Sequence, residues 1–255
     1  MRHLILSALI LGSAASAGTL RVGASPVPHA EILNFVKPLL ARQGVTLEVR
    51  EFTDYVQPNL ALADGSIDVN FFQHAPYLAA FQKDRPLGLV TGAKIHVEPI
   101  GLYSRRVKKL TELKTGATVA IPSDPSNSGR ALKLLERAGL IRLKAGTGTN
   151  ATPLDIRSNV RRLKFRELEA AQLPRALADV DAAVINTNYA LDAGLNPLKD
   201  ALTLEGANSP YANLLVVKPA TLKNPDYQAL VRALQSPATR RFILNTFGGA
   251  VVPAF

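Results

Sequence analysis

The sequence contains no cysteine, which excludes disulfides, thiolate metal sites, cysteine nucleophiles and lipid attachment through a cysteine. It also has no low-complexity tract, and only 20% of its residues are charged, a composition that argues against disorder. No apolar run reaches the roughly 20 residues that a membrane-spanning helix needs. With 255 residues and 47% hydrophobic content, the chain can bury one large core or two smaller ones.

The first seventeen residues follow the layout of an export signal. A short basic start, residues 1–3, precedes an apolar run from Leu4 to Gly12, and Ala15-Ser16-Ala17 supplies small residues where signal peptidase cuts. We therefore predict a signal peptide over residues 1–17 and a mature chain that begins near Gly18. That chain is expected to be soluble in the periplasm or an equivalent cell-wall space.

The net charge is +10, and it becomes +9 when Arg2 leaves with the signal. A positive surplus can attract nucleic acid, an anionic membrane surface or an anionic ligand. The densest basic groups lie at 105–109 and 161–166, and neither is interleaved with aromatic residues as single-strand binding sites are. The pattern favours a solvated basic surface, and we expect no nucleic-acid partner.

Hydrophobic periodicity predicts an α/β protein in which strands alternate with helices in two blocks. Such alternation is typical of parallel sheets with helices on both faces. The predicted strands are 19–24, 45–52, 67–71, 117–121, 163–165, 182–185 and 211–217. The predicted helices are 32–40 with a kink or a short break at Pro38, 56–63, 76–81, 127–138, 169–178, 188–193, 226–234 and 238–246.

Segments 96–104 and 211–218 are interpreted as two hinge crossings between lobes. Residues 18–100 and 212–255 then form lobe 1, and residues 101–211 form lobe 2. Ligands bind beyond the carboxyl ends of strands in such sheets, so the cleft between the lobes is the predicted site.

No motif indicates catalysis. The chain has neither a G-x-S-x-G elbow nor a phosphate-binding Walker loop. Residues 146–151 match the dinucleotide pattern, but Pro153 follows at once and no long helix opens there, so a surface loop is predicted. A non-enzymatic protein without a cofactor is expected, although an enzyme stays open because catalytic triads assemble in space rather than in sequence.

His29, His74 and His96, with Glu98 nearby, raise the possibility of a zinc site. No close ligand pair of the H-E-x-x-H kind is present, and each histidine lies in a different loop. Polar histidines of a cleft or hinge are the favoured interpretation, so no metal is predicted. A metal-binding receptor that uses these three histidines remains the alternative from another functional class.

Three segments carry polar or aromatic groups that suit a small ligand. Segment 122–130 is a loop that opens a helix with Arg130 in its first turn, which suits an anion; an ordinary N-cap with an exposed arginine fits equally well. Aromatic residues of 71–77, together with Tyr55, can line an apolar slot into which a thioether packs well. Segment 186–189 offers asparagine donors and acceptors, or alternatively a helix cap.

At these residues the chain resembles the NlpA lipoprotein family, the methionine-binding proteins of ABC importers. The matching blocks are 22–33, 70–74, 96–104, 122–132, 167–177, 183–190 and 209–213. The resemblance implies a two-lobed, type II-like binding protein that captures L- or D-methionine and delivers it to the permease and ATPase subunits of an importer. A methionine-containing dipeptide or another apolar amino acid is the nearer alternative.

The resemblance also implies roles for individual residues. Arg130 is expected to grip the α-carboxylate, while Asn188, together with Asn186, holds the amino or carboxylate end. The other residues expected around the ligand are Asn127, Tyr55, Phe72, His74, Tyr77, His96 and Tyr211. Family members usually carry a lipidated cysteine just after the signal, where this chain has Gly18. No lipid anchor is therefore expected.

Overall fold

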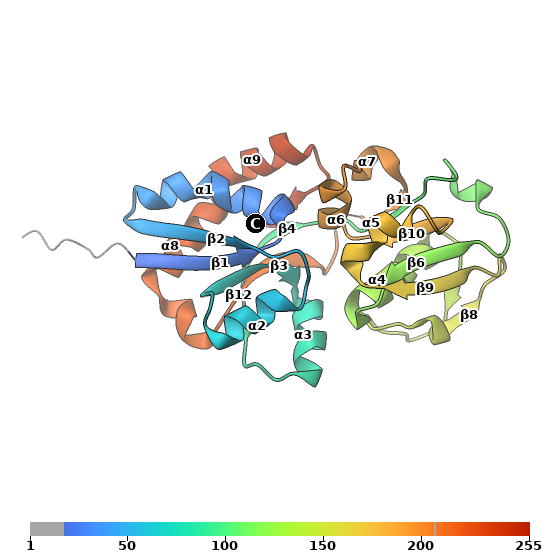
Figure 1. Cartoon of the computed structure of the whole chain (residues 1–255), viewed down its shortest axis with the longest axis horizontal. Coiled ribbons are helices and arrows are strands. Elements are labelled where there is room, and N and C mark those ends of the chain that lie inside the picture. The colour runs from blue at the N-terminus through green and yellow to red at the C-terminus, as the bar shows by residue number, and fades with distance from the viewer. Residues whose placement is uncertain (1–17, 207) are drawn as a thin grey trace, which may run out of the picture.

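The computed structural model describes residues 18–206 and 208–255, so the predicted signal peptide lies outside the described residues. The chain forms two α/β lobes that are joined by extended segments (Figure 1). Within the described residues, no helix has the length and apolar character needed to cross a membrane.

The first lobe contains a six-stranded sheet in the order β13-β4-β12-β3-β1-β2. Its strands are β1 (Gly18–Ala24), β2 (Val45–Glu51), β3 (Val69–His74), β4 (Val90–Val97), β12 (Ala212–Val217) and β13 (Val252–Pro253). Its helices are η1 (Pro26–Ala30), α1 (Glu31–Ala41), α2 (Gln57–Asp64), α3 (Ala75–Asp84), η5 (Pro219–Lys223), α8 (Pro225–Leu234) and α9 (Pro237–Phe247).

Helices cover both faces of this sheet. Helices α1, α8 and α9 pack together on one face, and α2 and α3 cover the other (Figure 1). Along β12, Leu215 and Val217 enter the core beneath α1, whereas Leu214 and Val216 enter the core beneath α2. This alternation follows from the two-residue repeat of a strand, and it explains why β12 is apolar at nearly every position.

The second lobe contains a five-stranded sheet in the order β11-β5-β10-β6-β9. Its strands are β5 (Gly101–Tyr103), β6 (Thr118–Pro122), β9 (Lys164–Leu168), β10 (Ala182–Ile185) and β11 (Ala201–Leu204), and a separate pair joins β7 (Arg142–Leu143) to β8 (Ile156–Ser158). Its helices are η2 (Leu110–Glu112), α4 (Pro125–Arg137), η3 (Pro153–Asp155), η4 (Ala170–Gln172), α5 (Leu173–Ala176), α6 (Thr187–Asp192) and α7 (Pro197–Asp200).

The prediction of parallel sheets is only partly right, because both sheets are mixed. The β1–β2, β1–β3, β6–β9 and β6–β10 pairs are parallel, whereas β12 pairs antiparallel with both β3 and β4. The chain leaves the first lobe along β4 and returns along β12, so these neighbours run in opposite directions. In the second lobe, β5 is likewise antiparallel to β10 and β11.

Strand β4 was not predicted, since Gly92 interrupts its β-forming residues. A side chain at Gly92 would place its Cβ only 2.1 Å from the hydroxyl of Tyr227, so the close approach of α8 requires glycine there. Two other expectations are corrected. Helix α1 runs continuously through Pro38, so the short break that was one of the two alternatives there is wrong. The helix predicted at 169–178 is two short turns, η4 and α5.

Candidate ligand-binding site

A small, partly open cavity lies between the lobes. The end of β3 and the start of α3 line it from the first lobe, the starts of α4 and α6 line it from the second, and the hinge segments complete it. Its lining residues are Tyr55, Phe72, Gln73, His74, Tyr77, Glu98, Asn127, Arg130, Asn186, Thr187, Asn188 and Asn213.

Most of the predicted site residues meet at this cavity. The eight that line it are Arg130, Asn188, Asn186, Asn127, Tyr55, Phe72, His74 and Tyr77. His96 and Tyr211 do not line it but lie one layer behind: His96 contacts Glu98, and the Tyr211 ring supports Arg130. Sequence reasoning missed Gln73, Thr187 and Asn213 as lining residues, and it named Glu98 only as a neighbour of the histidines.

Arg130 is buried, and it does not lie in the first turn as predicted. Helix α4 begins at Pro125, and its N-cap residue Asp124 accepts a hydrogen bond from Asn127 N at 2.9 Å. The helix start is therefore satisfied by its own cap, which places Arg130 in the second turn. The capping interpretation of the loop is right, and the exposed arginine that accompanied it is wrong.

Arg130 is held on three sides. Its Nε lies 3.2 and 3.1 Å from the two carboxylate oxygens of Glu205, and its Nη2 also pairs with this carboxylate. Nη2 donates to the Glu98 carbonyl oxygen at 2.6 Å, and the guanidinium carbon lies 4.4 Å from the centre of the Tyr211 ring. Among the described residues, Nη1 has no hydrogen-bond partner, and Glu205 does not line the cavity. These contacts fix the guanidinium in place, and its Nη1 stays available as a donor.

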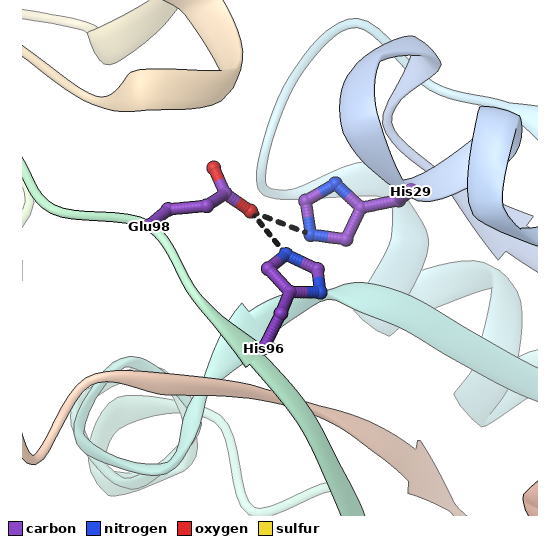
Figure 2. A group of neighbouring side chains, drawn as sticks. All are labelled: His29, His96 and Glu98. Carbon is purple, nitrogen blue, oxygen red and sulfur yellow. Dashed lines mark hydrogen bonds and ion pairs between the residues drawn. The ribbon is translucent and has the colours of Figure 1, made fainter. Parts of the chain in front are cut away.

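The Glu98 carboxylate lies between two histidines (Figure 2). His96 Nε2 donates to Glu98 Oε1 at 2.7 Å, and His29 Nε2 lies 3.1 Å from the same oxygen. Burial opposes ionisation of Glu98, but the charge of His29 and the hydrogen bonds of both imidazoles outweigh it, so the pKa of Glu98 is held well below its usual range. The cavity therefore contains a buried, ionised carboxylate.

The donor geometry favours a hydrogen-bonded cluster over a metal centre. His29, His96 and Glu98 offer three ligand atoms within 4.8 Å of one another, but His74 belongs to a different network. Histidines that ligate metals almost always donate their second ring nitrogen to a partner. Within the described chain, the Nδ1 atoms of His29 and His96 are buried without one.

Side-chain amides form two separate hydrogen-bonded pairs among the other polar residues of the cavity. Asn127 Oδ1 accepts from Asn186 Nδ2 at 3.0 Å, and Tyr55 donates its hydroxyl hydrogen to Asn188 Oδ1 at 2.6 Å. Asn186 Oδ1 is buried with no partner among the described residues. Because a buried polar atom without a hydrogen bond is costly, this oxygen suits a donor supplied by a ligand. Asn188, with its oxygen occupied, offers its nitrogen as a donor.

His74 is neutral and fixed in one tautomer. Its Nδ1 accepts from Tyr77 N at 3.1 Å, so the hydrogen is on Nε2, which lies 3.2 Å from Asn127 Oδ1. Burial, with a smaller contribution from the charge of Arg130, lowers the pKa of His74 to about 3.

A pH dependence of stability follows from this lowered pKa. In the unfolded chain His74 takes up a proton near its ordinary pKa of about 6.5, whereas the folded chain resists it until the pH nears 3. Its contribution to stability is therefore present above pH 6.5 and is lost as the pH falls. Between pH 7 and 5, the free energy of unfolding should drop by about 2 kcal/mol more in the wild type than in His74→Gln. Urea titrations of both proteins at both pH values measure this, and equal drops would contradict it.

Three aromatic rings form the apolar part of the cavity. The ring centres of Tyr55, Phe72 and Tyr77 lie 5.7 to 5.9 Å apart, so they make a nearly regular triangle. The Tyr77 hydroxyl donates to the Tyr55 carbonyl oxygen at 2.8 Å and fixes the arrangement. Rings this close pack directly against one another, so they form an apolar wall of the cavity. A thioether that packs on this wall gains favourable contacts with the ring edges.

Comparisons with known proteins agree on one family. Residues 20–255 match the NlpA lipoprotein family. The membrane lipoprotein TpN32 of Treponema pallidum is 44% identical over 237 residues, which are 92% of this chain and 88% of that protein. The D-methionine-binding lipoprotein MetQ of Salmonella typhimurium is 46% identical over 213 residues, which are 83% and 79% of the two chains.

A solved structure is also similar to this chain over most of its length. The nutrient-binding protein of Burkholderia cenocepacia bound to methionine superposes with a TM-score of 0.90 at 49% identity, covering 92% of this chain and all of that one. Because relatives are named as lipoproteins, they give no support to the expectation that this chain lacks a lipid anchor. With nearly its whole described length matched and the lobes of a substrate-binding protein, the chain belongs to the NlpA lipoprotein family.

Proposed function

We propose that this protein is a methionine receptor that buries one zwitterionic amino acid between its lobes. The observation that carries the proposal is the presence of both donor and acceptor groups beside one aromatic wall. Arg130 and Asn188 offer donors, while Glu98 and Asn186 offer acceptors. Burial of both charges of a zwitterion requires a partner for each, and this cavity supplies them. Relatives whose names or structures include methionine support the choice of side chain.

The contacts suggest one orientation for the ligand. Its carboxylate meets Nη1 of Arg130 and the amide nitrogen of Asn188, and its ammonium group meets Glu98 and the unpartnered oxygen of Asn186. The thioether packs against the aromatic wall formed by Tyr55, Phe72 and Tyr77. In this arrangement each polar group of the cavity binds rather than reacts, so the protein acts as a receptor without turnover and passes methionine, L or D, to an ABC importer.

The test is to identify and titrate the ligand. Small molecules released by unfolding the purified protein are identified by mass spectrometry. The refolded protein is then titrated calorimetrically with L-methionine, D-methionine, a glycyl-methionine dipeptide and norleucine. We expect methionine to be released in near one-to-one amount and to bind more tightly than norleucine, which lacks the sulfur. Tighter binding of the dipeptide would change the cargo, and stoichiometric zinc with no amino acid would overturn the proposal.

A further inference from the structure

Helix α6 of the second lobe makes contacts with the first lobe along its whole length. The Thr187 hydroxyl donates to the carbonyl oxygen of Pro99 in the first hinge segment, and the Tyr189 hydroxyl donates to the carbonyl oxygen of Thr53 at 3.0 Å. Leu191 packs against the first lobe's main core. Helix η1 of the first lobe also lies against α6. One short helix therefore connects the two lobes through both polar and apolar contacts.

The first lobe also packs a side chain against a core of the second lobe. Tyr55 packs against the second lobe's cluster that includes Tyr189 and Ala190, and the centres of the Tyr55 and Tyr189 rings lie 5.0 Å apart. Each lobe thus places one large side chain against a core of the other, Leu191 in one direction and Tyr55 in the opposite one. Such an exchange buries apolar area only when the lobes are together, so it favours the closed arrangement.

The side chains of α6 divide into two groups. Thr187 and Asn188 line the ligand cavity, whereas Tyr189 and Leu191 do not. Thr53, the acceptor for Tyr189, is also outside the cavity lining. Contacts of the second group form between the lobes without involving a bound molecule.

We infer that Tyr189 and Leu191 form a cross-lobe clasp that sets how tightly and how long the receptor holds its ligand, although neither contacts it. The inference rests on the proposed function, because it concerns a receptor that opens to admit methionine and closes over it. Interactions made only in the closed state slow reopening and therefore slow release. Capture occurs from the open state, in which the clasp is not formed. Loss of the clasp therefore changes the association rate only through the open fraction of the free receptor.

The expected effects appear mainly in the dissociation rate. Tyr189→Phe removes a single interlobe hydrogen bond and should speed release about 3- to 10-fold. Leu191→Ala removes partly buried apolar area and should speed release about 5- to 20-fold. The association rate should change by less than about twofold in both, since affinity differences among such variants are mostly in dissociation.

Two substitutions serve as matched controls. Tyr227 is a buried tyrosine whose hydroxyl is used inside the first lobe, near Gly92 and Ala93. Leu222 packs against the same core as Leu191, but from η5 of the first lobe itself. Tyr227→Phe and Leu222→Ala remove the same chemical groups without affecting a contact between the lobes. Both should lower the melting temperature while leaving the methionine dissociation rate unchanged.

Closure and release are measured on the same protein. Because the chain has no native cysteine, the exposed residues Lys83 and Arg137, one from each lobe, are replaced by cysteine and labelled with a fluorophore pair. Energy transfer reports the distance between the lobes, and stopped-flow mixing with methionine gives the two rates. We expect both clasp variants to have a smaller closed fraction without ligand and faster release than their controls.

The outcomes separate the clasp from the proposed ligand. A clasp variant with the same closed fraction and dissociation rate as its control would overturn the clasp. If methionine fails to bind the unaltered protein, the proposed function fails, yet the closed fraction without ligand still decides the clasp. The clasp would also be overturned if its variants lost affinity through slower association and not through faster dissociation. That result would place Tyr189 and Leu191 in ligand capture.

Discussion

Arg130→Ala is expected to weaken methionine binding by about 3 to 5 kcal/mol, or roughly 150- to 5,000-fold. The substitution removes the proposed partner of the ligand carboxylate in a buried site, where an unpaired charge is strongly unfavourable. It also leaves Glu205 without its guanidinium partner, so some loss of folding stability accompanies the loss of affinity. Calorimetric titration gives the first effect and urea unfolding gives the second.

The control for Arg130 is Arg106→Ala. Arg106 pairs with Asp181 in the same lobe through an exposed salt bridge, with Nη1 and Oδ1 2.9 Å apart. Exposed pairs contribute little, so this variant should keep both affinity and stability. Arg130→Lys adds a second comparison, because it keeps the charge but loses the planar fork; it should bind more weakly than wild type and more tightly than Arg130→Ala. Unchanged methionine affinity in a folded Arg130→Ala protein would remove this residue from the site.

Glu98→Gln is expected to weaken methionine binding by about 2 to 4 kcal/mol, because the ligand ammonium loses its ionised partner. The low pKa of Glu98 means that its charge is present above the ordinary pKa of a glutamate and is lost only well below it. Methionine affinity should therefore stay constant from pH 7.5 to pH 5 as far as Glu98 is concerned. Titration of both proteins at several pH values tests the two statements together.

An analogue without the amino group isolates the role of Glu98. The wild type should bind 4-(methylsulfanyl)butanoate far more weakly than methionine, since the analogue has no ammonium group to pair with Glu98. In Glu98→Gln the difference between the two ligands should shrink by most of the loss seen for methionine. An equal loss for both ligands would mean that Glu98 supports the architecture of the cavity and does not hold the ammonium group.

Several helices and strands were predicted correctly from short stretches of the sequence. The strand at 182–185 has the predicted bounds, and the two C-terminal helices begin and end within one residue of their predicted limits. These elements combine clear periodicity with proline at the helix starts, signals that act over a few residues. Strand β4 was missed because the reason for Gly92 lies in α8, more than a hundred residues along the chain.

The functional site shows the same limit: residues that depend on distant parts of the chain could not be predicted from short stretches of the sequence. Arg130 and the asparagines of segment 186–188 follow strands in the sequence, which makes them recognisable as residues at carboxyl ends of a sheet. Glu98 has no such signal of its own, because its buried charge depends on His29, which comes from another element. Asn213 reaches the cavity only through the return of β12 to the first sheet. Contacts between residues so far apart in the chain leave no signal in a short stretch of the sequence.

The position of β12 in the first sheet has a consequence for the order in which the protein forms. This strand lies between β3 and β4 and pairs with both, so the centre of the sheet stays open until residues 212–217 are available. A chain made from its amino end therefore cannot complete the first sheet until residues 212–217 have been synthesised. By then every strand of the second sheet, from β5 to β11, is already available, so the second lobe can form before the first is complete.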